Sequence, residues 1–190
     1  LARLPGLPTA APTVVLDAGM QASALAIESD YLLFAGSLRL ATGNIDVVGA
    51  NTRTTVASEL RGSAGLTKLG AGTLVLAGAA TYTGTTRVAN GTLELRSVGE
   101  RLPDASALVL DEGARLRLAG SSFTETVGTL VGTGTVLFEG GEHTLRVGAD
   151  NGNDEFLGNL IDAGVGARLV KVGTGTQILR GANVLGRGLD

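Results

Sequence analysis

A glycine-led pattern returns along this chain about every 20 residues. In each copy a glycine is followed by a small or polar residue and then by an alternating apolar triplet. The copies begin at Gly72, Gly91, Gly113, Gly134 and Gly175, and the last step covers close to two periods. A unit of this length with several short strands cannot bury its own apolar face and must stack on its neighbours, as one coil of a β-solenoid does. The glycines supply the positive φ or the close approach that tight corners between strands require.

Short runs with period-two alternation follow one another from Thr13 onward, each bounded by Gly, Asn, Asp or Ser, and this pattern is typical of strands rather than helices. The clearest runs are residues 13–16, 38–40, 73–76, 92–95, 108–110, 115–118, 136–138, 144–147 and 178–180. We therefore expect an all-β fold, a right-handed parallel β-helix with coils of roughly 20 residues, over residues 13–190. Residues 1–12 contain three prolines and lack the pattern, and we expect a linker or the tail of an upstream element there.

Leu and Val are expected to point inward as stacked aliphatic ladders, with Thr92, Glu94, Arg115 and Arg117 pointing outward. A longer repeat lies over the short one, because seven residues between 66 and 78 recur, all at one constant spacing, between 169 and 181. Since this spacing is close to five coils, the two copies are predicted to lie on the same side of the solenoid, roughly 25 Å apart.

Composition narrows the classes of partner. With 44% hydrophobic and 17% charged residues the 190-residue chain is globular rather than disordered, and aromatics at 3% imply a core of small aliphatic side chains. No cysteine is available for a disulfide or a thiolate site. The net charge is −3 and the 15 Lys and Arg are scattered along the sequence, so we predict no nucleic-acid partner. Neither a membrane-spanning apolar run nor a signal peptide is visible, and because the chain starts at Leu1 we expect any targeting signal to have preceded it.

Residues 65–95 read GLTKLGAGTLVLAGAATYTGTTRVANGTLEL and resemble the passenger-associated repeat of autotransporters, whose pattern runs GLTKxGxGTLxLxGxNTYTGxTxVxxGTLxL. Only the Asn before Thr81 is missing, replaced by Ala80. A second copy, assigned to residues 168–190, is similar in LVKVGTGTQILRGAN and then departs from the pattern at Val184, so it has diverged or is truncated. Residues 126–136 are similar to the segment that joins such repeats.

This resemblance implies a surface or secreted protein of a Gram-negative bacterium, anchored in the outer membrane by a C-terminal β-barrel translocator of the same polypeptide. It also allows an N-terminal effector domain and a surface for host cells or for self-association. Our main hypothesis is a non-catalytic β-helical stalk that supports secretion and presents the effector. The alternatives are an adhesin that binds host or bacterial cells, and the stalk of a subtilisin-like serine protease; any catalytic domain is expected outside this chain.

The sequence contains no complete constellation for a chemical site, and we predict no catalytic, cofactor-binding or metal-binding residue. The single histidine, His143 in GGEHTL, is expected to be an exposed turn residue because no partner for a triad or metal cluster accompanies it. The glycine pairs at 70–72 and 173–175 lack the third glycine and the helix of a dinucleotide site, so corner glycines are expected. The polar stretch 148–156 ends like one calcium-binding nonapeptide but occurs once, which favours a solvated loop over a weak calcium site.

Charged residues on neighbouring coils could form a lyase-like or glycosidase-like site, and the candidates are Glu94, Arg96, Asp111, Glu112 and Arg117. The sequence does not show that they converge, and Asp111 and Glu112 precede Gly113 at an expected turn. The repeated lysines Lys68 and Lys171 are interpreted as residues that cover a strand edge.

Overall fold

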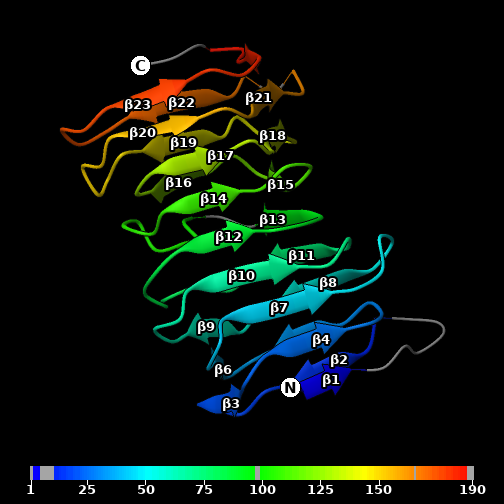
Figure 1. Cartoon of the computed structure of the whole chain (residues 1–190). Helices are drawn as coiled ribbons and strands as arrows, with labels where there is room; N and C mark the ends of the chain where they lie inside the picture. The colour runs from blue at the N-terminus through cyan, green and yellow to red at the C-terminus, as the bar shows by residue number, and fades with distance from the viewer. Residues whose placement is uncertain (1, 5–10, 97–98, 165, 188–190) are drawn as a thin grey trace.

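The computed structural model describes residues 2–4, 11–96, 99–164 and 166–187, and within these ranges the chain is built of strands and turns without a helix. The strands stack in parallel into a right-handed solenoid of about eight turns with three faces, so the predicted fold class is confirmed (Figure 1). The described residues contain no helix that could cross a membrane.

The first face is one nine-stranded parallel sheet with the order β1-β4-β7-β10-β12-β14-β17-β20-β23. Its strands are β1 (Ala2–Leu4), β4 (Leu25–Ile27), β7 (Asn44–Val47), β10 (Leu66–Leu69), β12 (Thr86–Val88), β14 (Leu108–Leu110), β17 (Leu130–Gly132), β20 (Asp154–Phe156) and β23 (Gln177–Leu179). This face is turned toward the viewer in Figure 1.

The second face is another nine-stranded parallel sheet, β2-β5-β8-β11-β13-β15-β18-β21-β24. Its strands are β2 (Thr13–Val15), β5 (Leu32–Phe34), β8 (Arg53–Val56), β11 (Thr73–Leu76), β13 (Thr92–Arg96), β15 (Arg115–Ala119), β18 (Thr135–Glu139), β21 (Asn159–Asp162) and β24 (Asn183–Val184). The third face holds two shorter sheets, β3 (Met20–Ala22), β6 (Ser37–Leu40) and β9 (Glu59–Arg61), then β16 (Thr124–Val127), β19 (Thr144–Val147) and β22 (Arg168–Lys171).

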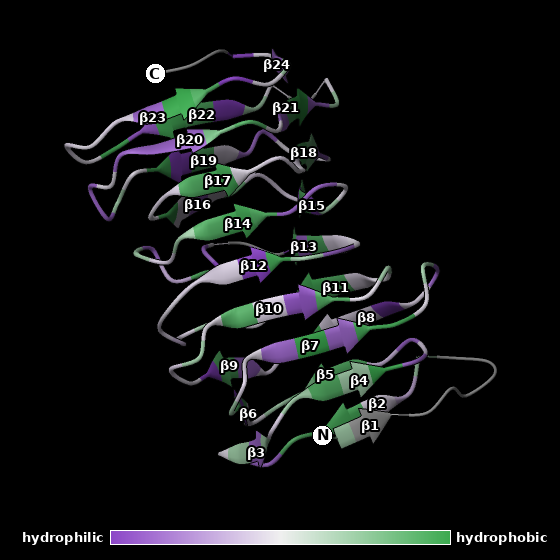
Figure 2. Cartoon of the chain, viewed as in Figure 1, coloured by the Kyte–Doolittle hydropathy of each residue, from purple (hydrophilic) through white to green (hydrophobic). Residues whose placement is uncertain are grey.

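Register in the second sheet defines each coil. Leu74 pairs with Leu93, Leu93 with Leu116, Leu116 with Val136 and Val136 with Leu160, and of these four coils the first is the shortest and the last the longest. All five side chains are fully buried and form one inward column. Figure 2 shows hydrophobic segments recurring in strands of successive coils, as in β14, β17 and β23. Full burial of an aliphatic side chain contributes about 1.5–3 kcal/mol. Each coil gains this only by stacking on the next, which is why the apolar triplets recur at the coil period.

Corner glycines occupy positions that no side chain could fill. Gly70 has a φ of +74°, and a Cβ there would lie 2.2 Å from the carbonyl oxygen of Val47 on the preceding coil. A Cβ at Gly175 would lie 1.9 Å from the carbonyl oxygen of Gly152. The close approach of successive coils therefore requires glycine at both places.

The two copies of the long repeat do not lie on the same side, so that prediction is wrong. Leu66 begins β10 on the first face, whereas Leu169 lies in β22 on the third face. Following the first sheet for five coils from Leu66 leads to Gln177, which comes later in the chain than Leu169. The spacing of the repeat therefore falls short of five full coils, and this shortfall moves the second copy back by one face of the solenoid.

The N-terminal segment is described only in part. Ala2–Leu4 form β1 and pair in parallel with β4, while residues 5–10 of the expected linker lie outside the described residues. The division of the chain at residue 13 therefore stays a prediction.

Candidate functional site

Glu94 lies at the centre of a charged cluster on the outer side of the second sheet. It is 0% exposed, because three arginines cover it. Arg53 donates to both carboxylate oxygens at 2.7 and 2.6 Å, Arg96 Nε lies 3.0 Å from Oε1 and Arg117 Nη1 lies 3.0 Å from Oε2. Arg53 reaches across the intervening strand β11, where the outward-facing Val75 is also buried. Glu94 thus points outward as expected, but it is sealed from solvent rather than exposed.

The electrostatics of this cluster favour the ionised carboxylate. Burial by itself would raise the pKa of Glu94, but the hydrogen bond from Arg53 and the charges of Arg53, Arg117 and Arg96 outweigh it and lower the pKa. Arg117 also donates through Nε to Glu139 on the next coil at 2.7 Å. The cluster links β8, β13, β15 and β18, and guanidinium groups pair with both of its carboxylates, Glu94 and Glu139.

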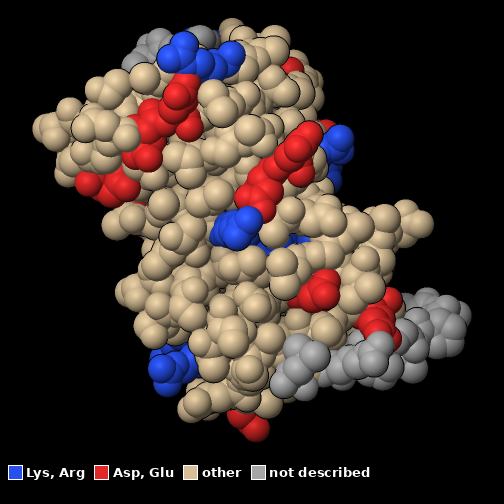
Figure 3. All heavy atoms as spheres, in the orientation of Figure 1, with Lys and Arg blue, Asp and Glu red and all other residues tan. Residues whose placement is uncertain are grey.

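Three of the five candidate residues on neighbouring coils converge, and two do not. Glu94, Arg96 and Arg117 meet in the cluster just described. Asp111 instead forms an ion pair with Arg87 at 2.6 Å, and Glu112 is exposed at the turn after β14. On the side of the molecule that carries the first sheet, basic and acidic side chains lie next to each other near the middle (Figure 3).

Arg53 and Glu139 belong to the Glu94 cluster but were not singled out in the sequence. The coil period could have pointed to them, because residues a whole number of coils apart lie side by side on the same sheet. Arg53 is two coils before Glu94, through the pairing of β8 with β11 and of β11 with β13. Glu139 is two coils after it, through the pairing of β13 with β15 and of β15 with β18.

Lys68 points into the solenoid rather than covering a strand edge, which corrects the sequence-based interpretation. Its side chain is 0% exposed, in register between the buried Ile45 and Val88 of the first sheet. The ammonium donates to the carbonyl oxygens of Leu69 at 2.8 Å and Gly70 at 2.7 Å, which form its own corner. A third bond, at 3.0 Å, reaches the carbonyl oxygen of Asn90 on the next coil, so Lys68 joins two coils.

Lys171 repeats part of this arrangement in the second copy. Its ammonium donates to the carbonyl oxygens of Val172 and Gly173, the two residues of the following corner, and its side chain is half-buried. The recurring lysine therefore binds the corner that follows it. No described strand of this sheet follows β22, so a bond from Lys171 to a following coil is outside what the structure describes.

Glu125 is a second buried carboxylate, and no motif pointed to it. It faces inward in register with Leu145, at the place where the third face has a break between β9 and β16. Its oxygens accept hydrogen bonds from the backbone N–H groups of Arg101 at 2.8 Å and Leu102 at 2.7 Å. Burial raises the pKa of Glu125 to about 8, and the nearby charge of Glu100 adds to the effect. The carboxylate thus accepts the backbone hydrogen bonds that a carbonyl oxygen of a neighbouring strand would accept if the sheet were continuous here.

His143 is buried at 1% exposure, so the expectation of an exposed turn residue is wrong. Its ring meets Phe123 edge to face, with centroids 4.7 Å apart, and its Nε2 lies 3.0 Å from the carbonyl oxygen of Glu139. Burial lowers the pKa of His143. Its Nδ1 finds no hydrogen-bond partner among the described residues, and the side chain packs in the solenoid beside an aromatic ring.

The polar stretch 148–156 contacts the coil that follows it. Asn151 Oδ1 accepts a hydrogen bond from the backbone N–H of Thr174 at 2.9 Å, and Asn153 Oδ1 accepts one from Thr176 at 2.8 Å. Within the part of the chain that the structure describes, no three His, Cys, Asp or Glu side chains are grouped as a metal site would need.

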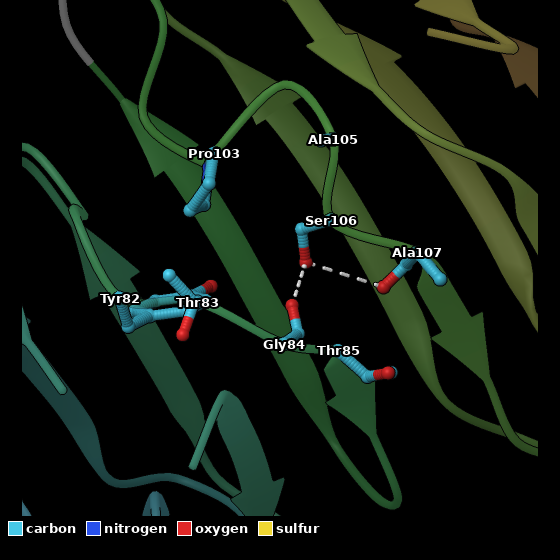
Figure 4. A pocket seen from close by; sticks show the side chains of 8 residues that line it. All are labelled: Tyr82, Thr83, Gly84, Thr85, Pro103, Ala105, Ser106 and Ala107. Carbon is cyan, nitrogen blue, oxygen red and sulfur yellow. Dashed lines mark hydrogen bonds between the residues drawn. The ribbon is translucent and has the colours of Figure 1, made fainter. Parts of the chain in front are cut away.

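A hollow of about 300 Å³ lies where the TYTGT segment of the first repeat meets the next coil (Figure 4). Ser106 closes one side, donating to the carbonyl oxygen of Gly84 at 2.7 Å, and its hydroxyl also meets that of Thr86 at 3.0 Å. Tyr82 is buried beside them, with its hydroxyl 2.6 Å from Thr86 Oγ1. The hollow is lined by Tyr82, Thr83, Gly84, Thr85, Pro103, Ala105, Ser106 and Ala107, a set without a charged side chain.

Comparisons with known proteins agree with this architecture. The model of the passenger-associated-transport-repeat family matches residues 66–95 and 169–185. Over 123 residues, 64% of this chain, the sequence is 36% identical to the adhesin BmaC autotransporter of Brucella suis biovar 1 (strain 1330). The chain spans about 4% of the length of that relative. No solved structure matches the chain significantly. The chain is therefore a β-solenoid segment of the autotransporter passenger type, built with passenger-associated-transport repeats.

Proposed function

We propose that this chain is a non-catalytic stalk of an autotransporter passenger. The observation that carries the proposal is the use of its polar side chains. Glu94, Lys68, Glu125 and Asn151 all bind groups on another coil, so these charged and polar side chains, which could otherwise serve a reaction, hold the solenoid together.

As such a stalk, the protein would lie at the surface of a Gram-negative bacterium or be secreted from it. The match to an autotransporter supports a C-terminal β-barrel translocator in the same polypeptide, to which the passenger is joined. An effector domain on the N-terminal side would be held away from the membrane by about 4.8 Å for each coil.

Coil-on-coil stacking also supplies a driving force for export. Each coil that emerges outside the membrane buries its aliphatic side chains on the coil already folded, and this burial is favourable by about 1.5–3 kcal/mol for each large side chain. Stacking thus opposes backward movement of the chain, and it requires that successive coils stay in register.

Two deletions in the full-length parent protein test this function through surface display. Removing residues 66–107 takes out two whole coils, because Leu66 pairs with Thr86 and Thr86 with Leu108. Removing residues 65–95 takes out fewer residues but about one and a half coils. We expect the larger, in-register deletion to be displayed near the parental level and the smaller one to be displayed poorly. Normal display of the 65–95 deletion would count against the stalk.

Adhesion is the second candidate function, and the similarity to a protein named as an adhesin favours it. The purified chain separates the alternatives. Binding to host or bacterial cells would support an adhesin, and cleavage of a polysaccharide would support an enzyme. Neither activity is expected of a stalk, including the stalk of a subtilisin-like protease whose catalytic domain lies elsewhere in the polypeptide.

A further inference from the structure

The sequence contains two Asn-Gly dipeptides, Asn90–Gly91 between β12 and β13 and Asn151–Gly152 between β19 and β20. An asparagine before glycine can cyclise, because the glycine has no side chain that would hinder attack of its backbone nitrogen on the asparagine amide carbon. Both asparagines are exposed and both glycines are half-buried, so access of water is similar at the two corners. A difference in reactivity must therefore come from the contacts that each dipeptide makes.

At the first dipeptide the reacting groups are already in contact. The backbone N–H of Gly91 donates to Asn90 Oδ1 at 2.7 Å, so the nitrogen touches the side-chain amide that it would attack. The amide carbon is bonded directly to this oxygen and therefore lies close to the nitrogen. Holding two reacting groups together in this way removes much of the entropic cost of bringing them into contact.

A buried cation contacts the same peptide group. The Lys68 ammonium donates to the carbonyl oxygen of Asn90 at 3.0 Å, and this oxygen and the Gly91 nitrogen belong to one peptide bond. When the nitrogen loses its proton, the negative charge is shared with the carbonyl oxygen. A positive charge placed where negative charge develops lowers the energy of the anion, and more so away from water. Lys68 therefore makes the Gly91 nitrogen easier to deprotonate.

The second dipeptide is held in the opposite way. Asn151 Oδ1 accepts hydrogen bonds from the backbone N–H of Thr174 at 2.9 Å and from its hydroxyl at 3.2 Å, so the side chain is tied to the following coil. The backbone N–H of Gly152 donates to Asp150 Oδ1 at 3.1 Å. This carboxylate stabilises the protonated amide and repels the anion that cyclisation needs. The second corner therefore resists the reaction that the first corner favours.

We propose that Asn90 is a site of spontaneous covalent modification, at which the Gly91 nitrogen closes a succinimide ring. Hydroxide removes the proton of the Gly91 N–H, the nitrogen forms a bond to Asn90 Cγ, and the Cγ–Nδ2 bond breaks. Nδ2 takes a proton from water and leaves as ammonia. A water molecule then opens the ring, so the sum of the steps exchanges the amide for a carboxylate without oxidation or reduction. Each chain modifies itself once, without enzymatic turnover.

Lys68 also directs which product forms. The carbonyl that it contacts becomes one of the two carbonyl groups of the ring, and its ammonium stabilises the oxyanion that forms when water attacks there. Opening at this carbon routes the backbone through the Asn90 side chain, which gives isoaspartate and lengthens the corner by one carbon. The carbonyl oxygen of Gly91 accepts a hydrogen bond at 2.9 Å from the backbone N–H of Arg115 on the next coil, so the longer corner disturbs the stacking of neighbouring coils.

Peptide mass mapping of the 190-residue chain, incubated at pH 7 both folded and in urea, measures deamidation at Asn90 and Asn151. In the folded chain we expect Asn90 to react about tenfold faster than Asn151, with isoaspartate as the main product. In urea the two rates should be similar. Lys68→Met should slow the reaction of Asn90 about tenfold, whereas Lys171→Met, the matched control, should leave it unchanged.

The pH profile of the reaction identifies the ammonium. Burial lowers the pKa of Lys68 to about 8, although the charge of Asp46 on β7 partly opposes this. Arg87, the charged residue of the other flanking strand, β12, pairs with Asp111. The rate at Asn90 should therefore rise with hydroxide up to about pH 8 and level off above it, as Lys68 loses its charge. In Lys68→Met the rate should keep rising.

Equal rates at the two asparagines in the folded chain would overturn the proposal, as would a faster reaction of Asn90 in urea than in the folded chain. An unchanged rate in Lys68→Met would overturn the role of the ammonium. Unfolding would also release Asn151, so a slower Asn90 beside an unchanged Asn151 distinguishes loss of the charge from a loosened fold. Asn90→Gln, whose longer side chain closes the ring poorly, should abolish the signal at this position.

Discussion

Replacing Lys68 with methionine tests whether the buried ammonium joins coils. Methionine keeps the length and the apolar stem of the side chain but removes three donors to the carbonyl oxygens of Leu69, Gly70 and Asn90. Hydrogen bonds from a charged donor contribute about 1.5–3 kcal/mol each. Against this stands the cost of burying the charge, which lowers the pKa of Lys68 to about 8 although Asp46 partly offsets the effect. That lowering corresponds to about 3 kcal/mol.

The balance of the two contributions predicts that Lys68→Met lowers the free energy of unfolding by about 3 kcal/mol. Urea denaturation followed by circular dichroism measures it, as a midpoint roughly 1 M lower than in the parent chain. Lys171→Met is the matched control. Among the described residues its ammonium binds the corner that follows and no described coil lies beyond it, and its side chain is half-buried, so we expect a loss below about 1 kcal/mol in the 190-residue chain.

The reasoning has a pH signature as well. The pKa of Lys68 is lower in the folded chain, about 8, than its ordinary value of 10.5. The unfolded chain therefore binds more protons between these values, and the stability of the parent chain should rise with pH across this window relative to Lys68→Met. Equal destabilisation by the two lysine substitutions, or none by Lys68→Met, would refute the role of Lys68 between coils.

Three further predictions concern other positions. Glu94→Gln should lower the free energy of unfolding by about 2–3 kcal/mol at pH 7; because the folded-state pKa of Glu94 is lowered, the deficit should shrink as the pH falls below about 4.5, which urea titrations at pH 7 and pH 3 will show. The pH dependence expected for Glu125 is the opposite, since its pKa is raised from 4.5 to about 8 in the folded chain. The stability of the parent chain relative to Glu125→Gln should therefore fall as the pH rises from 4.5 to 8. The same difference in stability between the two proteins at pH 5 and pH 8 would contradict this. Gly72→Ala would place a Cβ 2.5 Å from the backbone oxygen of Gly49 and should cost about 1–3 kcal/mol, whereas in Gly49→Ala the nearest atom is a side-chain hydroxyl oxygen, at 2.7 Å, that can move, so its melting temperature should fall less.

The fold could be predicted from the sequence because the residues that repeat with its period each favour one local structure. Glycines mark the corners and alternating apolar triplets mark the strands, so each predicted run coincides with an observed strand to within one or two residues. The side facing the core also followed from alternation, as the inward column through Leu74 and Leu93 shows.

The location of the second repeat was not readable in this way. Individual coils differ in length, as the short coil from Leu74 to Leu93 and the long one from Val136 to Leu160 show, and errors in an assumed constant period add up over five coils. The length of each coil depends on its corner loops, which follow no period. The pairing of β22 with β19, which puts Leu169 in register with Leu145, is what places Leu169 on the third face.

The charged residues show the clearest division between what the chain alone determines and what tertiary structure decides. Local alternation determines whether a side chain points inward or outward, and it correctly placed Glu94 on the outer side of its strand. Whether a charged side chain is buried, and with which group it pairs, depends on which residues of the neighbouring coils lie beside it. That is why Glu94 is sealed by an arginine two coils away and why Lys68 caps a corner inside the solenoid. Strand geometry is a local property of the sequence, whereas contacts between coils depend on the summed lengths of every loop between them.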